Sequence, residues 1–410
     1  MLFTFVVLFL TLGCDLAYGQ EKEGNEKEEV MVALNFTGLN YGLEINDPWN
    51  PPILNKCVTV QNVKVNLSGY IHVNSNNIRL SNYSGDNSGT IDISVPKNDT
   101  IKSIIITTKT AKKNAVSKFT VSYMHNQQEI SKKYDNEKSK EPIQVNGIDS
   151  DHIILTPQKL GKLYLIQITL TYTRPKLDAT LDEKGENVES TISEIVGENK
   201  TLALNRTFNP SQLYTMCLPF DLSKDMITGI FGSETKVYSY AGYQNGELSF
   251  STVKEDVVLN AGMPFLMRPE YYVEQPTFAG VTVKSTTAQT VGGGEWEFCG
   301  TFGSYELAAD GTQLFLTAGG TLAKPLAESR KMRGFRCYLK KAAGTVNGSA
   351  QLPSVTIDGE TNAIKTAEYA APTSGTTAYS LSGMKLNAGC KTANGGIMII
   401  DGKKFITTNR

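Results

Sequence analysis

Short segments in which apolar and polar residues alternate run through residues 29–174. Alternation with a period of two is typical of a β-strand with one face in a core, and the Asn, Asp, Ser and Gly clusters between the segments are typical of turns. Seven segments are predicted as strands, at residues 31–36, 57–67, 90–95, 101–108, 117–124, 152–155 and 163–172. Strands at this spacing predict an antiparallel β-sandwich over residues 30–174.

Residues 200–357 carry a similar pattern. Its predicted strands are residues 201–207, 214–218, 235–240, 247–252, 263–267, 278–283, 295–302, 313–317 and 335–339. Only residues 222–231 have helical character, with Ser223 as the N-cap and Gly232 as the residue that ends the helix. We therefore predict a second β-rich module with one short helix.

The remaining segments differ in composition. Residues 175–199 are acidic and contain no aromatic residue, and residues 358–378 are rich in small residues, so both are predicted as linkers. Residues 379–410 include two apolar runs on either side of Asp401 and Gly402, a pair that favours a β-hairpin. The predicted fold class is therefore all-β: two tandem antiparallel β-sandwich domains followed by a small C-terminal β-meander.

The first residues indicate the compartment. Residues 2–12 form an apolar run that is shorter than the roughly 20 residues needed to span a bilayer but typical of a signal-peptide core. Two processing alternatives remain: a lipoprotein-type signal with lipid attached to Cys14, or ordinary cleavage after Gly19. We expect residues 1–19 to be the signal peptide and residues 20–29 a charged tether. The protein is then exported, either to the cell surface and outer membrane or to the extracellular space.

Composition argues against several classes of function. The 40 Lys and Arg residues are balanced by 41 Asp and Glu residues, so the chain lacks the basic surplus of a nucleic-acid binder. Three histidines leave little material for histidine-dependent catalytic or metal sites. We predict no catalytic residues, no metal, no cofactor and no nucleic-acid partner, and therefore no enzyme.

The cysteines show no metal-site spacing. Besides Cys14 they are Cys57, Cys217, Cys299, Cys337 and Cys390. Cys299 and Cys337 lie in predicted strands, and either a disulfide between them or buried free thiols would be consistent with the sequence.

Several motifs point to a family. Residues 205–208 (NRTF), 214–222 (YTMCLPFDL), 262–269 (GMPFLMRP) and 332–338 (MRGFRCY) resemble a β-rich module of Bacteroides and Prevotella surface proteins. Residues 378–384 (AYSLSGM) and 396–404 (GIMIIDGKK) resemble the C-terminal sorting module of secreted Bacteroidetes proteins, with Met384 where Arg is usual. The resemblance implies an adhesin-like secreted or surface protein, and it supplies no catalytic residue.

Two aromatic residues are the candidate ligand contacts. Trp49 lies in an Asn-Asp-Pro-Trp-Asn-Pro-Pro loop where no strand packing is expected, and Tyr41 lies in a turn-rich stretch nearby. A ring face in such a loop is suited to pack against a sugar. The alternative for Trp49 is that it folds back and caps the sandwich.

These observations favour a non-enzymatic, adhesin-like protein that binds a glycan, or a host or partner protein, through loops of the N-terminal sandwich. A carbohydrate-binding accessory, or the remnant of a secreted glycoside hydrolase, is a second hypothesis. The third is a fimbrial subunit that exchanges an edge strand between protomers.

Overall fold

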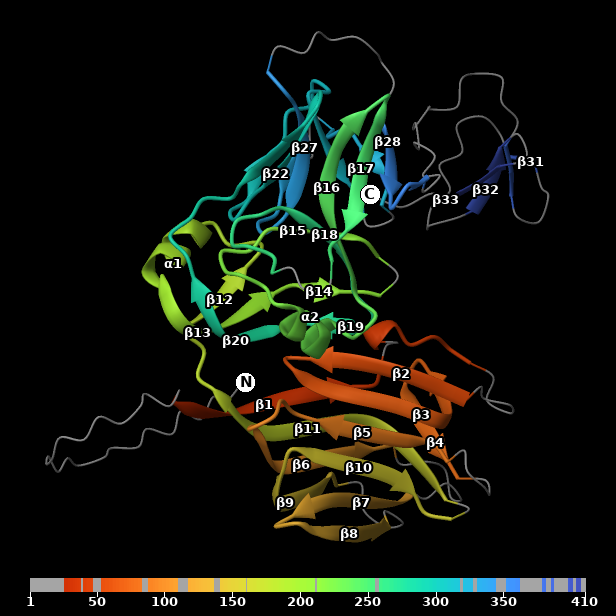
Figure 1. Cartoon of the computed structure of the whole chain (residues 1–410). Helices are drawn as coiled ribbons and strands as arrows, with labels where there is room; N and C mark the ends of the chain where they lie inside the picture. Colours follow the sequence, from red (N-terminus) through yellow and green to blue (C-terminus); the bar gives the residue numbers. More distant parts are fainter. Residues whose placement is uncertain are drawn as a thin grey trace, which may run out of the picture. The chain divides into compact units, whose positions relative to one another are not determined.

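The computed structural model describes residues 26–37, 40–46, 53–82, 88–109, 117–135, 141–159, 161–210, 212–254, 258–317, 320–326, 330–343 and 352–361, together with four short strands near the C-terminus. The chain divides into two compact units, Met1–Ala363 and Ile364–Arg410. Strands dominate the described residues, so the predicted all-β class is confirmed (Figure 1).

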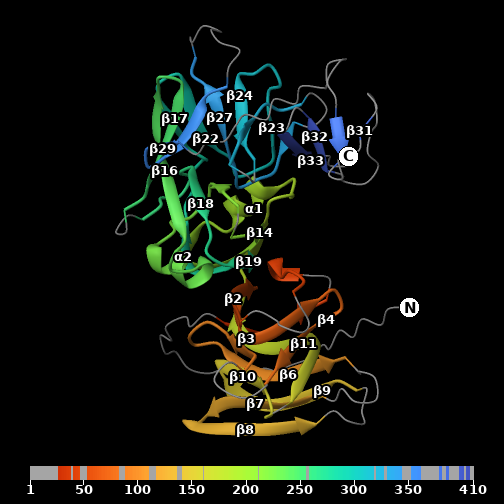
Figure 2. The same ribbon diagram turned by 90° about the vertical axis from the view of Figure 1, so that its right-hand side faces the viewer.

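The first block is a β-sandwich of two layers (Figures 1 and 2). One layer contains β9, β6 and β11, and both β1 and β4 pair with β11; the other has the order β8-β7-β10-β5-β3-β2. Strand β3 joins the layers because its last residues also pair with β4. The bounds are β1 (Lys27–Asn35), η1 (Asn40–Gly42), β2 (Ile53–Val60), β3 (Val63–Asn74), β4 (Asn77–Ser81), β5 (Thr90–Ser94), β6 (Thr100–Thr108), β7 (Lys118–His125), β8 (Gln128–Asp135), β9 (Ile143–Ser150), β10 (His152–Pro157) and β11 (Lys162–Pro175).

Alternation places one face of each inner strand in the core. On β5, Ile91 and Ile93 are buried while Thr90, Asp92 and Ser94 are half-buried. Their partners across the β5–β10 pair are Leu155 and Ile153, which are also fully buried. Burying each such side chain stabilises the fold by about 1.5–3 kcal/mol, so these cross-strand pairs set the register.

One predicted strand is wrong, because residues 57–67 form a hairpin. Gln61 and Asn62 have φ angles of 48° and 64°, and the chain reverses there with Val60 opposite Val63. Positive φ at both residues of a two-residue turn matches the twist of the flanking strands. The turn lacks the Asn-Gly signal that usually reveals it in a sequence.

The described residues of the second block form four sheets. Three of them share one large core, and the two-stranded β23–β26 sheet packs on a small separate cluster around Leu307 and Tyr338. The module was predicted to be antiparallel, but β12 pairs with β13 and β17 pairs with β28 in parallel. Neither β12 nor β28 is among the predicted strands. The bounds are β12 (Ala179–Asp182), α1 (Val188–Glu194), β13 (Gly197–Asn205), β14 (Thr207–Phe208), β15 (Tyr214–Met216), α2 (Lys224–Phe231), β16 (Lys236–Gln244), β17 (Glu247–Thr252), β18 (Phe265–Arg268), β19 (Tyr272–Glu274), β20 (Thr277–Val283), β21 (Thr290–Gly293), β22 (Trp296–Gly300), β23 (Tyr305–Glu306), β24 (Gln313–Leu316), β25 (Leu322–Ala323), β26 (Lys331–Met332), β27 (Cys337–Lys341), β28 (Ser354–Ile357) and β29 (Glu360–Thr361).

The predicted helix is confirmed as α2. The Ser223 side chain accepts a hydrogen bond from the backbone N–H of Met226 at 3.3 Å, which satisfies one of the free donors of the first turn. Gly232 has a φ of 107° and donates from its backbone N–H to Thr228, which ends the helix.

The segments predicted as tether and acidic linker take part in the fold. Residues 27–29 belong to β1, where Glu28 forms an ion pair with Arg174 of β11 at 3.0 Å. Within residues 175–199, the strand β12 and the helix α1 bury Leu181, Val188 and Ile192 in the second core. Because the segment is acidic overall, its three apolar positions did not predict a strand or a helix, yet they anchor β12 and α1 to the core.

The two blocks also share hydrogen bonds. Strand β19 pairs in parallel with β2 of the first sandwich. Beside this pair, the Asn62 side chain donates to the Thr277 carbonyl at 2.8 Å and accepts from the Thr277 N–H at 2.9 Å. The blocks predicted as tandem domains are thus joined by strand pairing within one compact unit.

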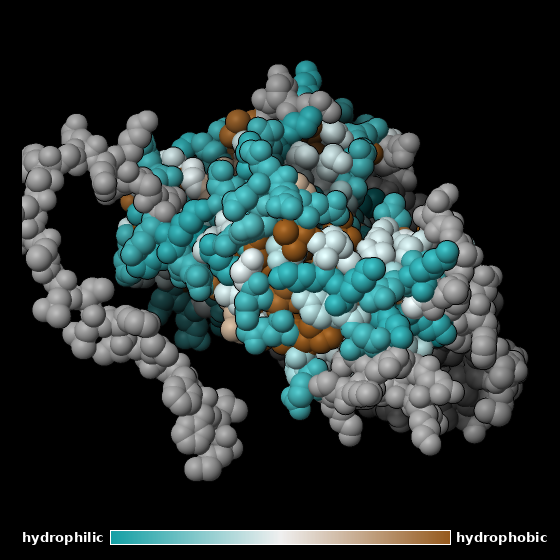
Figure 3. All heavy atoms as spheres, turned by 90° about the horizontal axis from the view of Figure 1, so that it is seen from below, coloured by the Kyte–Doolittle hydropathy of each residue, from teal (hydrophilic) through white to brown (hydrophobic). Residues whose placement is uncertain are grey.

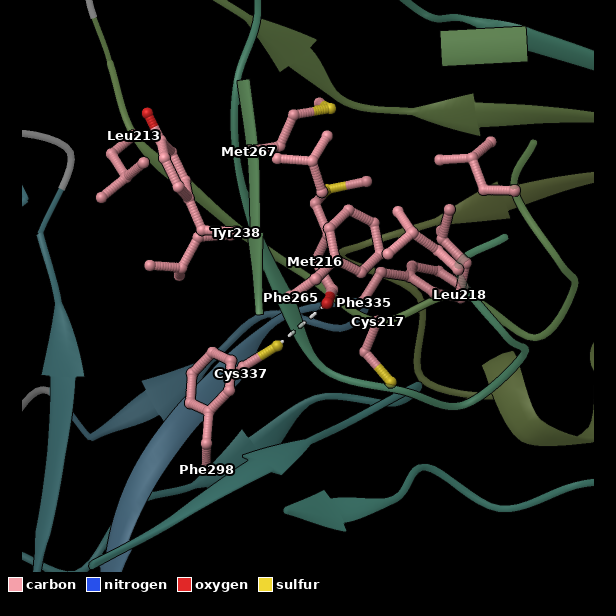
Figure 4. Packing of buried hydrophobic residues seen from close by; sticks show 14 of the residues in the cluster. Leu213, Met216, Cys217, Leu218, Tyr238, Phe265, Met267, Phe298, Phe335 and Cys337 are labelled. Carbon is pink, nitrogen blue, oxygen red and sulfur yellow. Dashed lines mark hydrogen bonds between the residues drawn. The ribbon is translucent and has the colours of Figure 1, made fainter. Parts of the chain in front are cut away.

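The cysteines of the described residues are free thiols, and two of them, Cys217 and Cys337, lie in the second core. Cys57, Cys217, Cys299 and Cys337 are all unbridged, which decides between the two cysteine alternatives for these residues. Figure 4 shows the sulfur of Cys337 directed at the carbonyl of Met216, to which it donates at 3.0 Å. Cys390 lies outside the described residues.

The second unit is a small sheet with the order β31-β30-β32-β33. Its strands are β30 (Ala378–Ser380), β31 (Lys385–Leu386), β32 (Ile397–Ile400) and β33 (Lys403–Ile406). The antiparallel register places Ile400 opposite Lys403, as the predicted hairpin requires.

On the face seen from below the view of Figure 1, the described surface residues are mostly hydrophilic, as expected for strands with one face in a core and the other in solvent (Figure 3). The hydrophobic areas on this face are small and bordered by hydrophilic residues. Exposed large apolar side chains such as Met31 and Ile53 are on strand edges or ends.

We expect Asn62→Gly to lower the free energy of unfolding by about 1–3 kcal/mol, because it removes both side-chain hydrogen bonds to Thr277. Glycine keeps the positive φ available, so the turn itself is retained. The matched control is Gln127→Gly, which is exposed and has a φ of 65° at the same turn position between β7 and β8. Urea denaturation measures both variants, and equal effects would contradict a stabilising role for the Asn62 bonds.

Candidate functional site

Of the residues predicted as contacts, the structure describes only Tyr41. Trp49 and Cys14 lie outside the described residues. Tyr41 is described, and it is buried with 6% of its surface exposed. Its hydroxyl accepts a hydrogen bond from the Asn35 N–H at 2.7 Å, and its ring packs edge-on against Phe36 and Tyr272.

Burial also raises the pKa of Tyr41 to about 12, so its phenol stays neutral. The observed role of Tyr41 is therefore packing, and a ligand could reach the ring only by displacing its neighbours. Its predicted part in binding stays a prediction.

A pocket of about 330 Å³ lies in the second block, and we call it the arginine pocket. It is formed where the segments after β12 and β13 meet β15 and the segment before β27. Its lining residues are Glu183, Lys184, Asn205, Arg206, Thr207, Gln212, Leu213, Tyr214, Thr215, Leu316, Arg333 and Arg336.

The carboxylate of Glu183 organises this pocket. Its Oε1 accepts a hydrogen bond from Arg333 at 2.8 Å, and its Oε2 accepts one from Arg336 at 2.8 Å. The Nε of Arg206 lies 3.5 Å from Oε2. Glu183 and Arg206 are buried, at 6% and 2% exposed, whereas Arg333 and Arg336 are 52% and 31% exposed.

Arg206 is fixed from several sides. Its Nη1 donates to the carbonyls of Thr215 at 3.1 Å and Phe335 at 3.2 Å. Its guanidinium lies 5.1 Å from the centre of the Phe208 ring and 5.2 Å from that of Tyr214, within cation–π range. Burial lowers the pKa of Arg206, and Arg336 acts in the same direction, but Glu183 beside it favours the charged form.

The backbone brings the arginines to the carboxylate. The Gly334 N–H donates to the Glu183 carbonyl at 2.8 Å. A side chain at position 334 would place its Cβ 2.3 Å from the Phe302 carbonyl oxygen, so only glycine fits this approach. Gly334 thus holds Arg333 and Arg336 on either side of one tight contact.

The electrostatics of the pocket are unbalanced. Burial alone would raise the pKa of Glu183, but Arg336, Arg206 and Arg333 together hold it below its ordinary value. The lining contains four cationic side chains, those of Lys184, Arg206, Arg333 and Arg336, and one carboxylate, so three positive charges are in excess among the lining residues. The buried Nε atoms of Arg206 and Arg336 have no hydrogen-bond partner among the described residues.

The sequence analysis missed this site. Its three arginines lie in residues 205–208 and 332–338, where the sequence shows only a family resemblance. More than a hundred positions separate Arg206 from Arg333, so no local spacing reveals that they share a carboxylate. Glu183 lies in the segment predicted as a linker, where no site residue was expected.

The described part of the chain shows no group of three or more His, Cys, Asp or Glu side chains that could hold a metal ion. Within the same residues, no helix has both the length and the apolar character needed to cross a membrane.

Comparison with known proteins gives no sequence match and distant structural matches. Neither a protein-family model nor a curated protein sequence matches the chain. Among solved structures, the family 32 CBM from C. perfringens NanJ in complex with galactose is 16% identical with a TM-score of 0.18, over 35% of this chain and 93% of that one. The arabinofuranosyltransferase AftD from Mycobacteria is 8% identical with a TM-score of 0.17, over 82% of this chain and 37% of that one. Likenesses this distant assign no family.

We expect Glu183→Gln to destabilise the protein by about 3–5 kcal/mol at pH 7, because it leaves buried Arg206 without its counter-charge. The folded-state pKa of Glu183 is lowered, so its contribution is present above the unfolded pKa, near 4.5, and is lost as the pH falls through the folded value. Urea denaturation from pH 7 downward should therefore show the two proteins converging in acid.

The control for this prediction is Glu306→Gln. Glu306 pairs with Arg330 at the surface, where it is 66% exposed, and surface pairs contribute about 0–1 kcal/mol. A Glu183 variant as stable as the Glu306 variant at pH 7 would show that the arginine cluster does not need its carboxylate.

Proposed function

We propose that this chain is an exported, non-enzymatic surface protein that binds a glycan at the arginine pocket. The observation that carries the proposal is a mostly polar pocket of about 330 Å³, in which hydrogen bonds hold the side chains of Glu183 and Arg206. This volume is at the lower end of the range for small-ligand sites, about 300–1,000 Å³. Export rests on the apolar run at residues 2–12, which is typical of a signal peptide.

The lining supports sugar binding through two kinds of contact. Asn205 and Thr207 are exposed and offer an amide and a hydroxyl to a ligand. Leu213, Leu316 and Tyr214 add apolar surface against which a sugar ring can pack. Most other lining groups are charged or hydrogen-bonding, as specificity for a hydroxylated ligand requires.

The state of the ionisable groups favours binding over catalysis. Both oxygens of Glu183 are held by guanidinium groups and its pKa is lowered, which makes it a poor general acid and a weak base. Burial raises the pKa of Tyr214, whose hydroxyl is already bonded to Gln212 and to the Asn209 N–H. Neither group is poised to exchange a proton near neutral pH.

Two features of the earlier prediction remain part of the proposal. Trp49 stays the candidate for a second contact in the N-terminal sandwich, with a surface protein as the alternative ligand. Lipid attached at Cys14 would hold the protein at the outer membrane.

We expect a glycan array on the full chain to identify ligands, and Thr207→Ala or Asn205→Ala to weaken the best of them about 2- to 10-fold by calorimetry. This range corresponds to one hydrogen bond lost in each variant. The control is Thr282→Ala, an equally exposed threonine on strand β20.

Two results would contradict the proposal. Loss of binding on Trp49→Ala, with Thr207→Ala unchanged, would move the site to the N-terminal sandwich. Hydrolysis of any array glycan by the purified chain would argue for an enzyme.

A further inference from the structure

We infer that the arginine pocket selects the oxyanion of an acidic sugar, that is, a carboxylate or a sulfate ester. The inference rests on the proposed function, since it names the class of glycan for the same pocket. Two observations carry it. The pocket has more guanidinium groups than carboxylates, and one of these groups is buried against Glu183 while the other two are partly exposed.

The first step concerns charge. Glu183 neutralises one of the four lining cations, and three positive charges remain at one concave surface. Charges in a partly dehydrated recess interact more strongly than the same charges in open water. A neutral glycan would leave this surplus uncompensated, whereas an oxyanion would complete the charge balance that Glu183 begins.

The second step concerns geometry. Arg206 is almost fully buried and serves as a positioning residue that holds Glu183. Arg333 and Arg336 are partly exposed, and among the contacts of the described residues each donates through one nitrogen only, to Glu183. A guanidinium has five N–H donors in a planar fork that matches carboxylate and sulfate oxygens. Both arginines therefore keep donors for an incoming oxyanion while Glu183 fixes their orientation.

The third step concerns the rest of the ligand. Free inorganic anions need no apolar surface, yet Leu213, Leu316 and Tyr214 line the same pocket. An acidic sugar presents both an oxyanion and the apolar face of a ring. The mixed lining thus favours an acidic sugar over a simple salt ion.

The first experiment probes the oxyanion alone. Inorganic sulfate is titrated into the full chain at constant ionic strength, and the binding constant and the unfolding midpoint are measured. We expect Arg333→Gln to weaken sulfate binding at least 5-fold, and the matched variant Arg330→Gln, outside the pocket, to bind as the wild type does. Lys184→Gln, an exposed pocket residue, provides a second test if Arg333→Gln lowers stability. The comparison of variants removes the general stabilisation that sulfate gives to any protein.

The second experiment uses pairs of glycans that share a sugar backbone, one member charged and the other neutral: oligogalacturonate against its methyl ester, and dextran sulfate against dextran. We expect at least one charged member to bind about 10-fold tighter than its neutral match, with a preference that falls as NaCl is raised and is lost in Arg333→Gln. The two pairs separate carboxylate from sulfate ester as the natural group.

The outcomes separate the two proposals. Glycan binding with no preference for the charged members would overturn the oxyanion inference and leave the proposed function standing. Sulfate binding that depends on Arg333, with no glycan bound, would support the oxyanion site and count against a glycan function. Sulfate binding equal in Arg333→Gln, Lys184→Gln and Arg330→Gln would also overturn the inference.

Discussion

A single buried carboxylate, that of Glu183, connects parts of the second block that are far apart in the chain. It receives guanidinium groups from Arg206, which follows β13, and from Arg333 and Arg336, which precede β27. Removing charges from water is costly, and the cost is offset only when partners are close and well oriented. The surrounding sheets must therefore hold these segments at fixed positions relative to Glu183. The close contact between Gly334 and the Phe302 backbone is one way in which they do so.

The sequence predicted those strands in which one face is apolar. Strand β5 alternates strictly, and β6, β10 and β11 are rich in Ile and Leu. The structure buries the positions of these strands that face the core, such as Ile104, Ile153 and Ile168. Strand β8 was not predicted because it is an edge strand with charged residues on exposed positions, and pairing with β7 alone does not require an apolar face. Helix α1 and strand β12 were not predicted for a similar reason, because their three core residues are separated by acidic and polar residues.

The candidate site was much less predictable than the fold. A loop aromatic such as Tyr41 attracts attention in a sequence, but its positive φ of 63° turns the chain so that the ring packs against Phe36 and Tyr272. No short sequence motif marks the arginine pocket, because its arginines come from segments far apart in the chain and meet only at the Glu183 carboxylate. Sequence reasoning that searches for paired acids or runs of lysine passes over an ion cluster of this kind.

The buried thiols have a consequence for the chemistry of the protein in an oxidising compartment, such as an exported chain would meet. Cys217 and Cys337 are at most 1% exposed, and burial raises the pKa of both, to about 12 for Cys217. The thiolate is the reactive form of cysteine, so oxidants and alkylating reagents meet almost none of it in the folded state. Once folded, the second core should therefore resist mispaired disulfides, and alkylation of Cys217 or Cys337 should require that core to open.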